Sequence, residues 1–150
     1  MKNRETLPKK EFIHTKLNEQ LNTFEKKRLC NRNAAIRYNI CVAVLGAFIT
    51  VLAGINITGG EEYARITILI ISSIIAILGT YNSFFNYKEL WIKYTMVTNE
   101  LKKIKSDFEF YLTGKEDEDI ELSELENFNK MVDDILDSAN KNWKLIRLKK

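Results

Sequence analysis

The side chains that could perform acid–base or metal chemistry are few and scattered in this 150-residue chain. His14 is the only histidine, which removes histidine-based catalytic triads and most histidine metal sites. Cys30 and Cys41 lack the spacing of a metal site or a disulfide framework. Gly59 and Gly60 have no phosphate-binding motif around them and indicate a loop turn. We therefore expect no catalytic, cofactor-binding or metal-binding residues, and no enzyme.

Charge and hydropathy are distributed very unevenly along the chain. The net charge of +3 and the isoelectric point near 8.8 are too mild to indicate nucleic acid as a partner. The mean hydropathy of −0.23 averages two uncharged stretches, residues 38–60 and 66–87, with strongly charged flanks. The two uncharged stretches therefore decide whether the sequence indicates a soluble protein or a membrane protein.

Both uncharged stretches have the length of a membrane-spanning helix. A hydrocarbon core of about 30 Å needs roughly 20 apolar residues in a helix. Counting only Ile, Leu, Val and Phe, each stretch contributes on the order of −4 to −5 kcal/mol toward insertion. A soluble bundle would need amphipathic helices to cover both stretches, but the remaining helical segments are highly charged. The sequence predicts membrane spans at residues 38–57 and 66–87.

The predicted fold is an all-α membrane protein: a two-span transmembrane hairpin with amphipathic cytoplasmic helices that form a bundle or a coiled coil. Lysine and arginine concentrate outside the spans, which places both termini in the cytoplasm. These residues are Lys26, Lys27, Arg28, Arg32 and Arg37 before the spans, Arg65 between them, and Lys88, Lys93, Lys102, Lys103 and Lys105 after them. The other segments are a cytoplasmic helix in residues 1–37 that begins near Pro8, an external loop at 58–65, a helix at 88–114 continuing unbroken from the second span, an acidic connector at 115–122, and an amphipathic helix at 123–150.

Each predicted span carries small and hydroxyl residues on one face. The residues are Asn39, Ala43, Gly46, Ala47, Thr50, Ala53 and Gly54 in the first span, and Ser72, Ser73, Ala76, Gly79, Thr80 and Ser83 in the second. Small residues let helices approach closely in lipid. Two interpretations stay open: the two faces pack together as a hairpin, or one face lines a narrow hydroxyl-rich pore after oligomerisation.

The segment after the second span has heptad spacing. Its apolar residues alternate in steps of four and three: Leu90, Tyr94, Val97, Leu101, Ile104, Phe108 and Tyr111. Similar faces occur before the first span (Phe12, Ile13, Leu17, Leu21, Phe24) and in the last helix (Leu125, Phe128, Val132, Ile135, Ala139, Trp143, Ile146). Gly114 suits a helix C-cap, and Ser123 and Glu126 have capping-box spacing. These faces can form one bundle within the chain or pair between subunits.

Residues 10–114 resemble the SLATT group, the SMODS- and SLOG-associating two-transmembrane effector domains. The likeness is carried by the basic segment before the first span, by the two-span architecture and by a short set of motif residues. The motif residues are Trp91, Tyr94, Glu100, Leu101, Tyr111, Leu112, Thr113 and Gly114. The likeness does not extend to the acidic connector or the last helix.

The resemblance implies a bacterial membrane effector of nucleotide-signalled conflict and anti-phage systems. Such domains assemble pores or disrupt the inner membrane when a separate sensor protein detects its signal. We therefore expect a multi-pass protein of the bacterial inner membrane. Its expected partners are the lipid bilayer, further copies of the chain and a nucleotide-signal sensor. The alternatives are a non-conducting scaffold that docks a cytoplasmic protein, and a holin-like protein.

Overall fold

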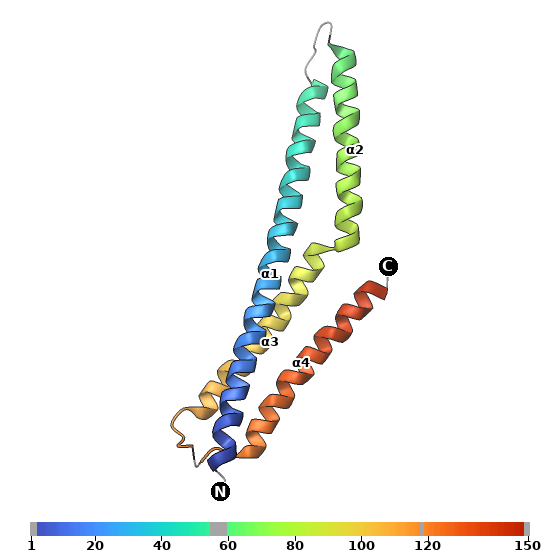
Figure 1. The fold of residues 1–150 in the computed structure, drawn as a ribbon. Helices are drawn as coiled ribbons and strands as arrows, with labels where there is room; N and C mark the ends of the chain where they lie inside the picture. Colours follow the sequence, from blue (N-terminus) through green and yellow to red (C-terminus); the bar gives the residue numbers. More distant parts are fainter. Residues whose placement is uncertain (1–2, 55–59, 118, 149–150) are drawn as a thin grey trace. The chain divides into compact units, whose positions relative to one another are not determined.

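The structure, a computed structural model, describes residues 3–54, 60–117 and 119–148, with side chains over residues 8–54, 60–117 and 119–141. Within these residues the protein is all-helical, as the sequence predicts. The helices are α1 (Asn3–Gly54), α2 (Glu61–Phe85), α3 (Tyr87–Leu112) and α4 (Leu122–Leu148) (Figure 1). Two helical segments, one in α1 and one beginning at Glu61, are long and apolar enough to cross a membrane.

The chain divides into two compact units. The bundle consists of residues 1–28 and 92–150, and the hairpin consists of residues 29–91. The first half of α1, most of α3 and α4 therefore belong to the bundle. The second half of α1, α2 and the first turn of α3 belong to the hairpin.

The bundle has a continuous apolar core contributed by all three of its helices. Leu17, Leu101, Phe108, Leu125 and Val132 are each 0% exposed. The predicted heptad face of α3 points into this core, because Leu101, Ile104 and Phe108 are buried and Tyr94, Val97 and Tyr111 pack against them. The amphipathic faces thus form one bundle within the chain, which is one of the two arrangements that the sequence left open. Leu90 is half-buried in the hairpin instead.

The predicted start of the first helix is wrong. α1 begins at Asn3, and Pro8 lies inside it. A proline within a helix removes one backbone donor and one hydrogen bond. So close to the helix start, that loss affects only the first turns and does not end the helix.

The predicted unbroken helix from the second span into residues 88–114 is also wrong. α2 ends at Phe85, and Asn86 adopts a left-handed conformation with φ 47° and ψ 52° before α3 begins. The Asn86 N–H donates to the Asn82 carbonyl at 2.7 Å, and the Asn86 carbonyl accepts the Leu90 N–H at 3.1 Å. The Asn86 side-chain amide donates to the Glu89 carboxylate. Asparagine tolerates this conformation because its short polar side chain bonds locally, so one residue closes α2 and opens α3.

Replacement of Asn86 will test this junction. Asn86→Val will destabilise the hairpin by about 1–2 kcal/mol relative to Asn86→Gly, because a β-branched residue strains at positive φ whereas glycine does not. Both variants lose the contact to Glu89, so the comparison isolates the backbone conformation. Denaturation in mild detergent, followed by circular dichroism, measures the difference. Equal stability of the two variants would show that α2 and α3 can join into one helix without strain.

The α3–α4 connection confirms one predicted cap and corrects another. Gly114 follows the end of α3 with φ 77°, as expected for a C-cap glycine. The capping box expected from Ser123 and Glu126 does not form: α4 begins at Leu122, and the Leu125 N–H donates to the Glu121 carbonyl at 3.3 Å. Glu126 pairs instead with Lys9 of α1.

Candidate functional site

Almost none of the described residues of the hairpin is fully buried in a single chain. Among its described residues Ala35 is the only buried one. In the most apolar run of 18 residues within α1, 6% of the residues are buried. In the corresponding run of the segment that begins at Glu61, 0% are buried. The core helix of a soluble protein is mostly buried. Few residues of these two helices are therefore buried within the hairpin itself.

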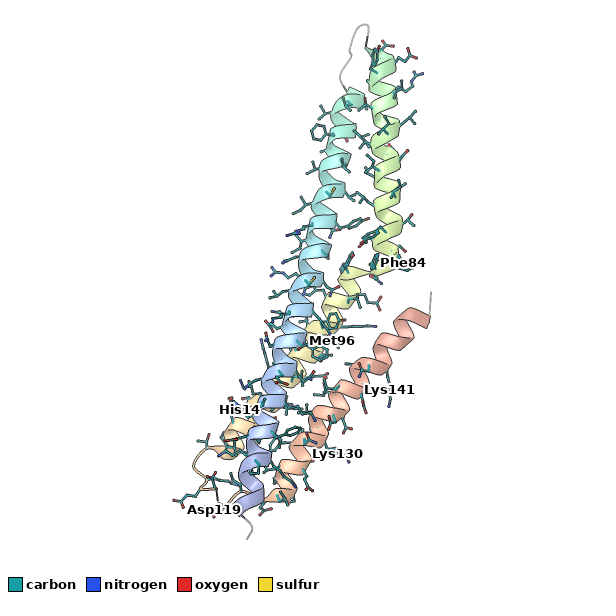
Figure 2. The ribbon with its side chains drawn as sticks, viewed as in Figure 1. His14, Phe84, Met96, Asp119, Lys130 and Lys141 are labelled. Atoms are coloured by element: carbon teal, nitrogen blue, oxygen red, sulfur yellow. The ribbon has the colours of Figure 1, made fainter. Side chains whose placement is uncertain are left out.

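A row of half-buried residues defines the contact between α1 and α2. In α1 these are Tyr38, Val42, Leu45, Ile49 and Leu52, and in α2 they are Ala64, Ile68, Ile71, Ile75, Leu78 and Asn82. Both rows follow steps of four and three, the spacing of helices packed at a shallow angle. Side chains of α1 and α2 face one another along the hairpin (Figure 2). The half-buried residues in these two rows are mostly aliphatic, and we name them the hairpin seam. Sequence reasoning missed this seam, and spacing alone could not have revealed it, because the small residues of each helix follow the same steps of four and three.

The small and hydroxyl residues do not form the hairpin contact. Of these predicted small and hydroxyl residues only Gly46 and Gly79 are half-buried, and the others are exposed. The exposed residues are Asn39, Ala43, Ala47, Thr50, Ala53, Gly54, Ser72, Ser73, Ala76, Thr80 and Ser83. A Cβ atom built on Gly46 or Gly54 would meet nothing within 4 Å, and one on Gly79 would lie 3.9 Å from the Tyr38 hydroxyl oxygen. Close approach within the chain therefore does not require these glycines. Of the two interpretations that the sequence left open, packing of the two small faces against each other does not match the exposure of these residues within one chain.

Both small faces fall on the same broad side of the hairpin. At 3.6 residues per turn, the small residues of each helix lie about 120° around the helix axis from its seam residues. The direction of this rotation, viewed from the N-terminus of each helix, is the same in α1 and α2. α1 and α2 run antiparallel, so an equal rotation from a shared seam turns both faces to one side. We name this side the hydroxyl side.

The opposite broad side is bulky and apolar. Its residues lie about 120° from the seam in the other sense. They are Ile40, Val44, Phe48 and Val51 of α1 and Ile66, Ile70, Ile74, Ile77, Tyr81 and Phe84 of α2, all between 43% and 69% exposed. We name it the aliphatic side. Leu69, 62% exposed, is a bulky residue that falls among the hydroxyl residues instead.

Several hydroxyls on the hydroxyl side bond to their own helix. Thr50 donates to the Gly46 carbonyl at 3.0 Å, Ser73 to the Leu69 carbonyl at 2.9 Å and Thr80 to the Ala76 carbonyl at 3.1 Å. This bond satisfies the hydroxyl proton in an apolar environment. The hydroxyl oxygen keeps capacity to accept a second hydrogen bond. The hydroxyl side is therefore compatible with lipid, with another helix and with water.

The motif residues of the resemblance mostly build the bundle. Leu101 lies in the core, and the Tyr94 ring lies 6.0 Å from that of Phe24. The Tyr111 hydroxyl accepts the Glu121 N–H at 3.1 Å, and the Lys115 ammonium lies 3.8 Å from the Tyr111 ring centre. Thr113 and Gly114 follow the end of α3, and Leu112 packs against the core. Glu100 is exposed, and Trp91 is a half-buried residue of the hairpin. These residues position helices and do not converge on a ligand site.

Groups capable of acid–base or metal chemistry stay dispersed in the described part of the chain. The exposed His14 contacts the Asn18 side chain at 3.1 Å. Both cysteines are free and exposed. Among the described residues, no group of three or more histidine, cysteine, aspartate or glutamate side chains could hold a metal ion. The surfaces of the hairpin and of the bundle are therefore the features to explain.

The fold and these surfaces define an all-helical protein with two helices long and apolar enough to cross a membrane. Residues 19–112 match the sequence model of DUF4231, a protein family of unknown function. Because this match covers more than half of the chain, the protein belongs to the DUF4231 family. No curated protein and no solved structure matches the chain.

Proposed function

We propose that the hairpin spans a membrane, with both termini on the cytoplasmic side. The exposed aliphatic side supports this proposal, because each of these bulky side chains is about half exposed and forfeits on the order of 1 kcal/mol of burial free energy in water. Insertion into lipid removes this surface from water without any further protein. The lysines and arginines that flank the spans support the orientation.

We further propose that the protein is an oligomeric membrane effector that forms a pore or perturbs the bilayer. The observation that carries the proposal is the division of the hairpin into a hydroxyl side and an aliphatic side. Small residues favour close contact between helices in lipid, whereas bulky aliphatic residues gain nothing from leaving it. In an oligomer the hydroxyl side faces other copies or a narrow water-filled path, and the aliphatic side faces the acyl chains.

The resemblance to SLATT domains supplies the biological setting of the proposal. The DUF4231 match at residues 19–112 overlaps most of the segment that carries that resemblance. In this setting the protein resides in the bacterial inner membrane, acts in an anti-phage or conflict system and causes arrest or death of the cell. A separate protein that senses a nucleotide signal provides the trigger.

A non-conducting scaffold is the second candidate. The bonds from Thr50, Ser73 and Thr80 to their own helix favour it, since they reduce the polarity that the hydroxyl side offers to water. In this case the hydroxyl side packs against other copies without a path between them. The bundle then docks a soluble partner.

Dye leakage and membrane potential in expressing bacteria distinguish the two candidates. We expect expression of the wild-type protein to depolarise the cells and to admit dye. Replacing Ser72, Ser73, Thr80 and Ser83 with leucine will return both signals to the level of cells that lack the protein, because no hydroxyl then lines the path.

The matched control replaces Ile66, Ile70, Ile74 and Ile77 on the aliphatic side with leucine and will leave the leak unchanged. A leak that survives the four leucines on the hydroxyl side would contradict a pore lined by that side. A normal membrane potential together with a stable complex with a soluble protein would favour the scaffold.

A further inference from the structure

Aromatic side chains gather where α2 meets α3. The centre of the Tyr81 ring lies 4.5 Å from that of Phe85, and the Phe85 ring stacks on Tyr87 with centres 5.5 Å apart. Phe84, labelled at this end of α2 in Figure 2, meets Phe85 edge to face at 5.1 Å. We name Tyr81, Phe84, Phe85 and Tyr87 the aromatic cluster.

The aromatic cluster combines apolar rings with two hydroxyl groups. The Tyr87 hydroxyl donates to the Tyr81 hydroxyl oxygen at 3.3 Å. Because a phenol hydroxyl both donates and accepts, Tyr81 keeps its own proton for an acceptor outside the chain. Tyr81 is 53% exposed and Phe84 is 69% exposed. Rings with an apolar body and a polar tip are enriched at membrane–water interfaces, so the aromatic cluster suits the cytoplasmic edge of the proposed span.

Arg37 of α1 lies beside the aromatic cluster. A Cβ atom built on Gly79 would lie 3.9 Å from the Tyr38 hydroxyl oxygen, so these two residues are neighbours across the hairpin. Arg37 precedes Tyr38 and therefore lies within about one helical turn of Tyr81 along the hairpin. Arg37 also precedes Val44 by seven residues, about two turns, which places both on the aliphatic side. Since Tyr81 belongs to the aliphatic side too, the two side chains share one side and a similar depth.

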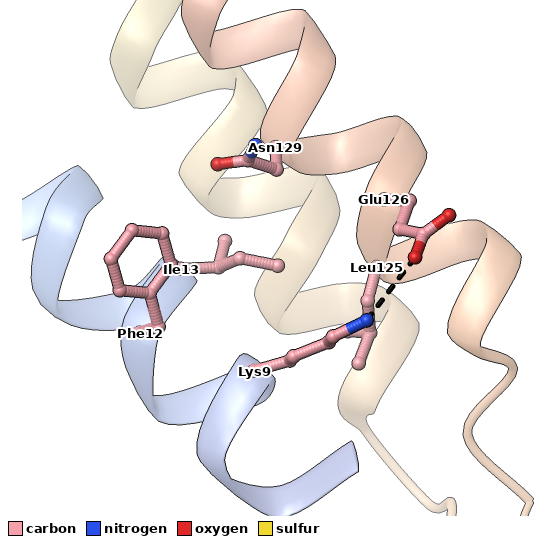
Figure 3. Close-up of a pocket in the computed structure, with 6 residues that line it drawn as sticks. All are labelled: Lys9, Phe12, Ile13, Leu125, Glu126 and Asn129. Carbon is pink, nitrogen blue, oxygen red and sulfur yellow. Dashed lines mark hydrogen bonds and ion pairs between the residues drawn. The ribbon is translucent and has the colours of Figure 1, made fainter. Parts of the chain in front are cut away.

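Arg37 carries a charge that the described part of the chain leaves unpaired. Among the described residues, its exposed guanidinium has neither an ion pair nor a hydrogen bond. In the bundle, by contrast, Lys9 lines a cavity of about 250 Å³ and is paired with Glu126 at 3.2 Å (Figure 3). A charge beside an apolar surface is costly unless an opposite charge meets it. Arg37 therefore favours an anionic partner from outside the hairpin.

The surroundings of Arg37 match a lipid better than a free anion. Side chains on a helix tilt toward its N-terminus, so Arg37 reaches away from the membrane centre toward the level of the aromatic cluster. In the other direction Ile74 and Ile77 continue the aliphatic side from Tyr81 into the proposed span. A phospholipid fits both parts, with its phosphate at the cationic end and its acyl chains along the isoleucines. A free phosphate ion would leave the isoleucines uncovered.

We propose that Arg37 and the aromatic cluster form a binding site for the headgroup of an anionic phospholipid. The Arg37 guanidinium pairs with the phosphodiester, and the Tyr81 hydroxyl donates to one of its oxygens. Arg32 and Lys88 add positive charge at this end of the hairpin against the single carboxylate of Glu89, which favours anionic over zwitterionic headgroups. The site rests on the proposed insertion of the hairpin and does not depend on whether the hairpin conducts.

Lipid binding by the purified full chain tests the site. Protein in mild detergent is titrated with phosphatidylglycerol or with phosphatidylethanolamine of the same acyl chains, and native mass spectrometry measures the bound lipid. We expect phosphatidylglycerol to bind about fivefold more tightly, the ratio that one contact between a basic residue and an anionic lipid supplies. Glycerol 3-phosphate, which carries the phosphate without acyl chains, will not displace it at equal concentration.

Three variants locate the site on the hairpin. Arg37→Gln removes the charge and will lower the affinity for phosphatidylglycerol to that for phosphatidylethanolamine. Tyr81→Phe keeps the ring, removes the hydroxyl and will lower the affinity for both lipids by about threefold. Arg32→Gln is the matched control. It removes the same charge five residues earlier, about 140° around α1, and will leave the preference unchanged.

Equal affinity of the wild type for the two lipids would overturn the site, and so would equal losses in Arg37→Gln and Arg32→Gln. Displacement by glycerol 3-phosphate would also overturn it, because the acyl chains would then contribute nothing. Circular dichroism identifies a variant that fails to fold, and the comparison of the two lipids on the wild type then decides alone. Insertion and lipid preference fail separately, since a chain that binds detergent but shows no preference contradicts only the site.

Discussion

Two arginines placed at Ile74 and Ile77 will lower the fraction of the chain that stays with membranes, because α2 then no longer inserts. Both positions lie on the aliphatic side of α2, 43% and 69% exposed. An arginine near the centre of a spanning helix costs about 2.5–3.5 kcal/mol of insertion free energy. Two of them, together with the loss of two isoleucines, exceed the roughly −4 to −5 kcal/mol that favours insertion of this helix. Alkaline washing of isolated membranes, followed by immunoblotting, measures the fraction retained.

The control places two arginines on exposed apolar residues of the bundle. Met96 and Phe110 are 59% and 81% exposed on α3, and the variant Met96→Arg with Phe110→Arg adds the same charge to the chain. We expect it to remain in the membrane fraction like the wild type. If the Ile74 and Ile77 variant is retained equally well, or if the wild-type protein is monodisperse in buffer without detergent, the proposed insertion of the hairpin is wrong.

Truncating Phe108 will destabilise the bundle by about 3–5 kcal/mol. Its side chain is 0% exposed and packs edge to face on Phe128, so Phe108→Ala leaves a cavity where α3 meets α4. A loss of this size is a large fraction of the 5–15 kcal/mol that stabilises a typical domain. Proteolysis of the bundle in mild detergent, as a function of denaturant, measures the free energy of its unfolding separately from the hairpin.

Phe110→Ala provides a matched control two residues away. Phe110 is 81% exposed, and substitutions at exposed positions usually change stability by less than about 0.5 kcal/mol. Both variants change helix propensity equally, because the same substitution is made on the same helix. The difference between their stability losses therefore reports the burial of Phe108. Similar losses in the two variants would mean that the heptad face of α3 does not point into the core.

The proposals assign different tasks to the two units. The hairpin supplies the contact with lipid and, through its hydroxyl side, the contacts or path within the membrane. The bundle supplies a packed apolar core to which α1, α3 and α4 contribute. Loss of the bundle in Phe108→Ala is accordingly expected to leave membrane fractionation intact. Loss of insertion in the double arginine variant is expected to leave the core residues of the bundle packed.

Heptad spacing predicted the core of the bundle well. The α3 residues Leu101, Ile104 and Phe108 are buried as their four-three spacing indicates. A heptad pattern fixes which side of a helix is apolar, and that side must be buried somewhere. It does not specify the partner, and the structure shows that α1 and α4 of the same chain provide it.

The hairpin was harder to predict because both spans are apolar nearly all round. The small faces were the most distinctive pattern, and they left open either close packing between α1 and α2 or the lining of a pore. The structure instead uses Leu45, Ile49 and other aliphatic residues for that contact. All sides of such a helix are similarly apolar, so polarity does not show which side faces its neighbour. The shapes of the two helix surfaces decide which residues form the hairpin seam.

Residue types and their order alone determined that this protein is helical, that two segments suit a membrane and that three charged helices carry apolar faces. These properties follow from composition and spacing within single helices, where each contribution depends on near neighbours along the chain. Only the tertiary structure decided that the bundle closes within one chain, that Asn86 divides α2 from α3, and that both small faces turn to one side of the hairpin. Those outcomes depend on which residues far apart in the chain meet, and no local pattern encodes that choice.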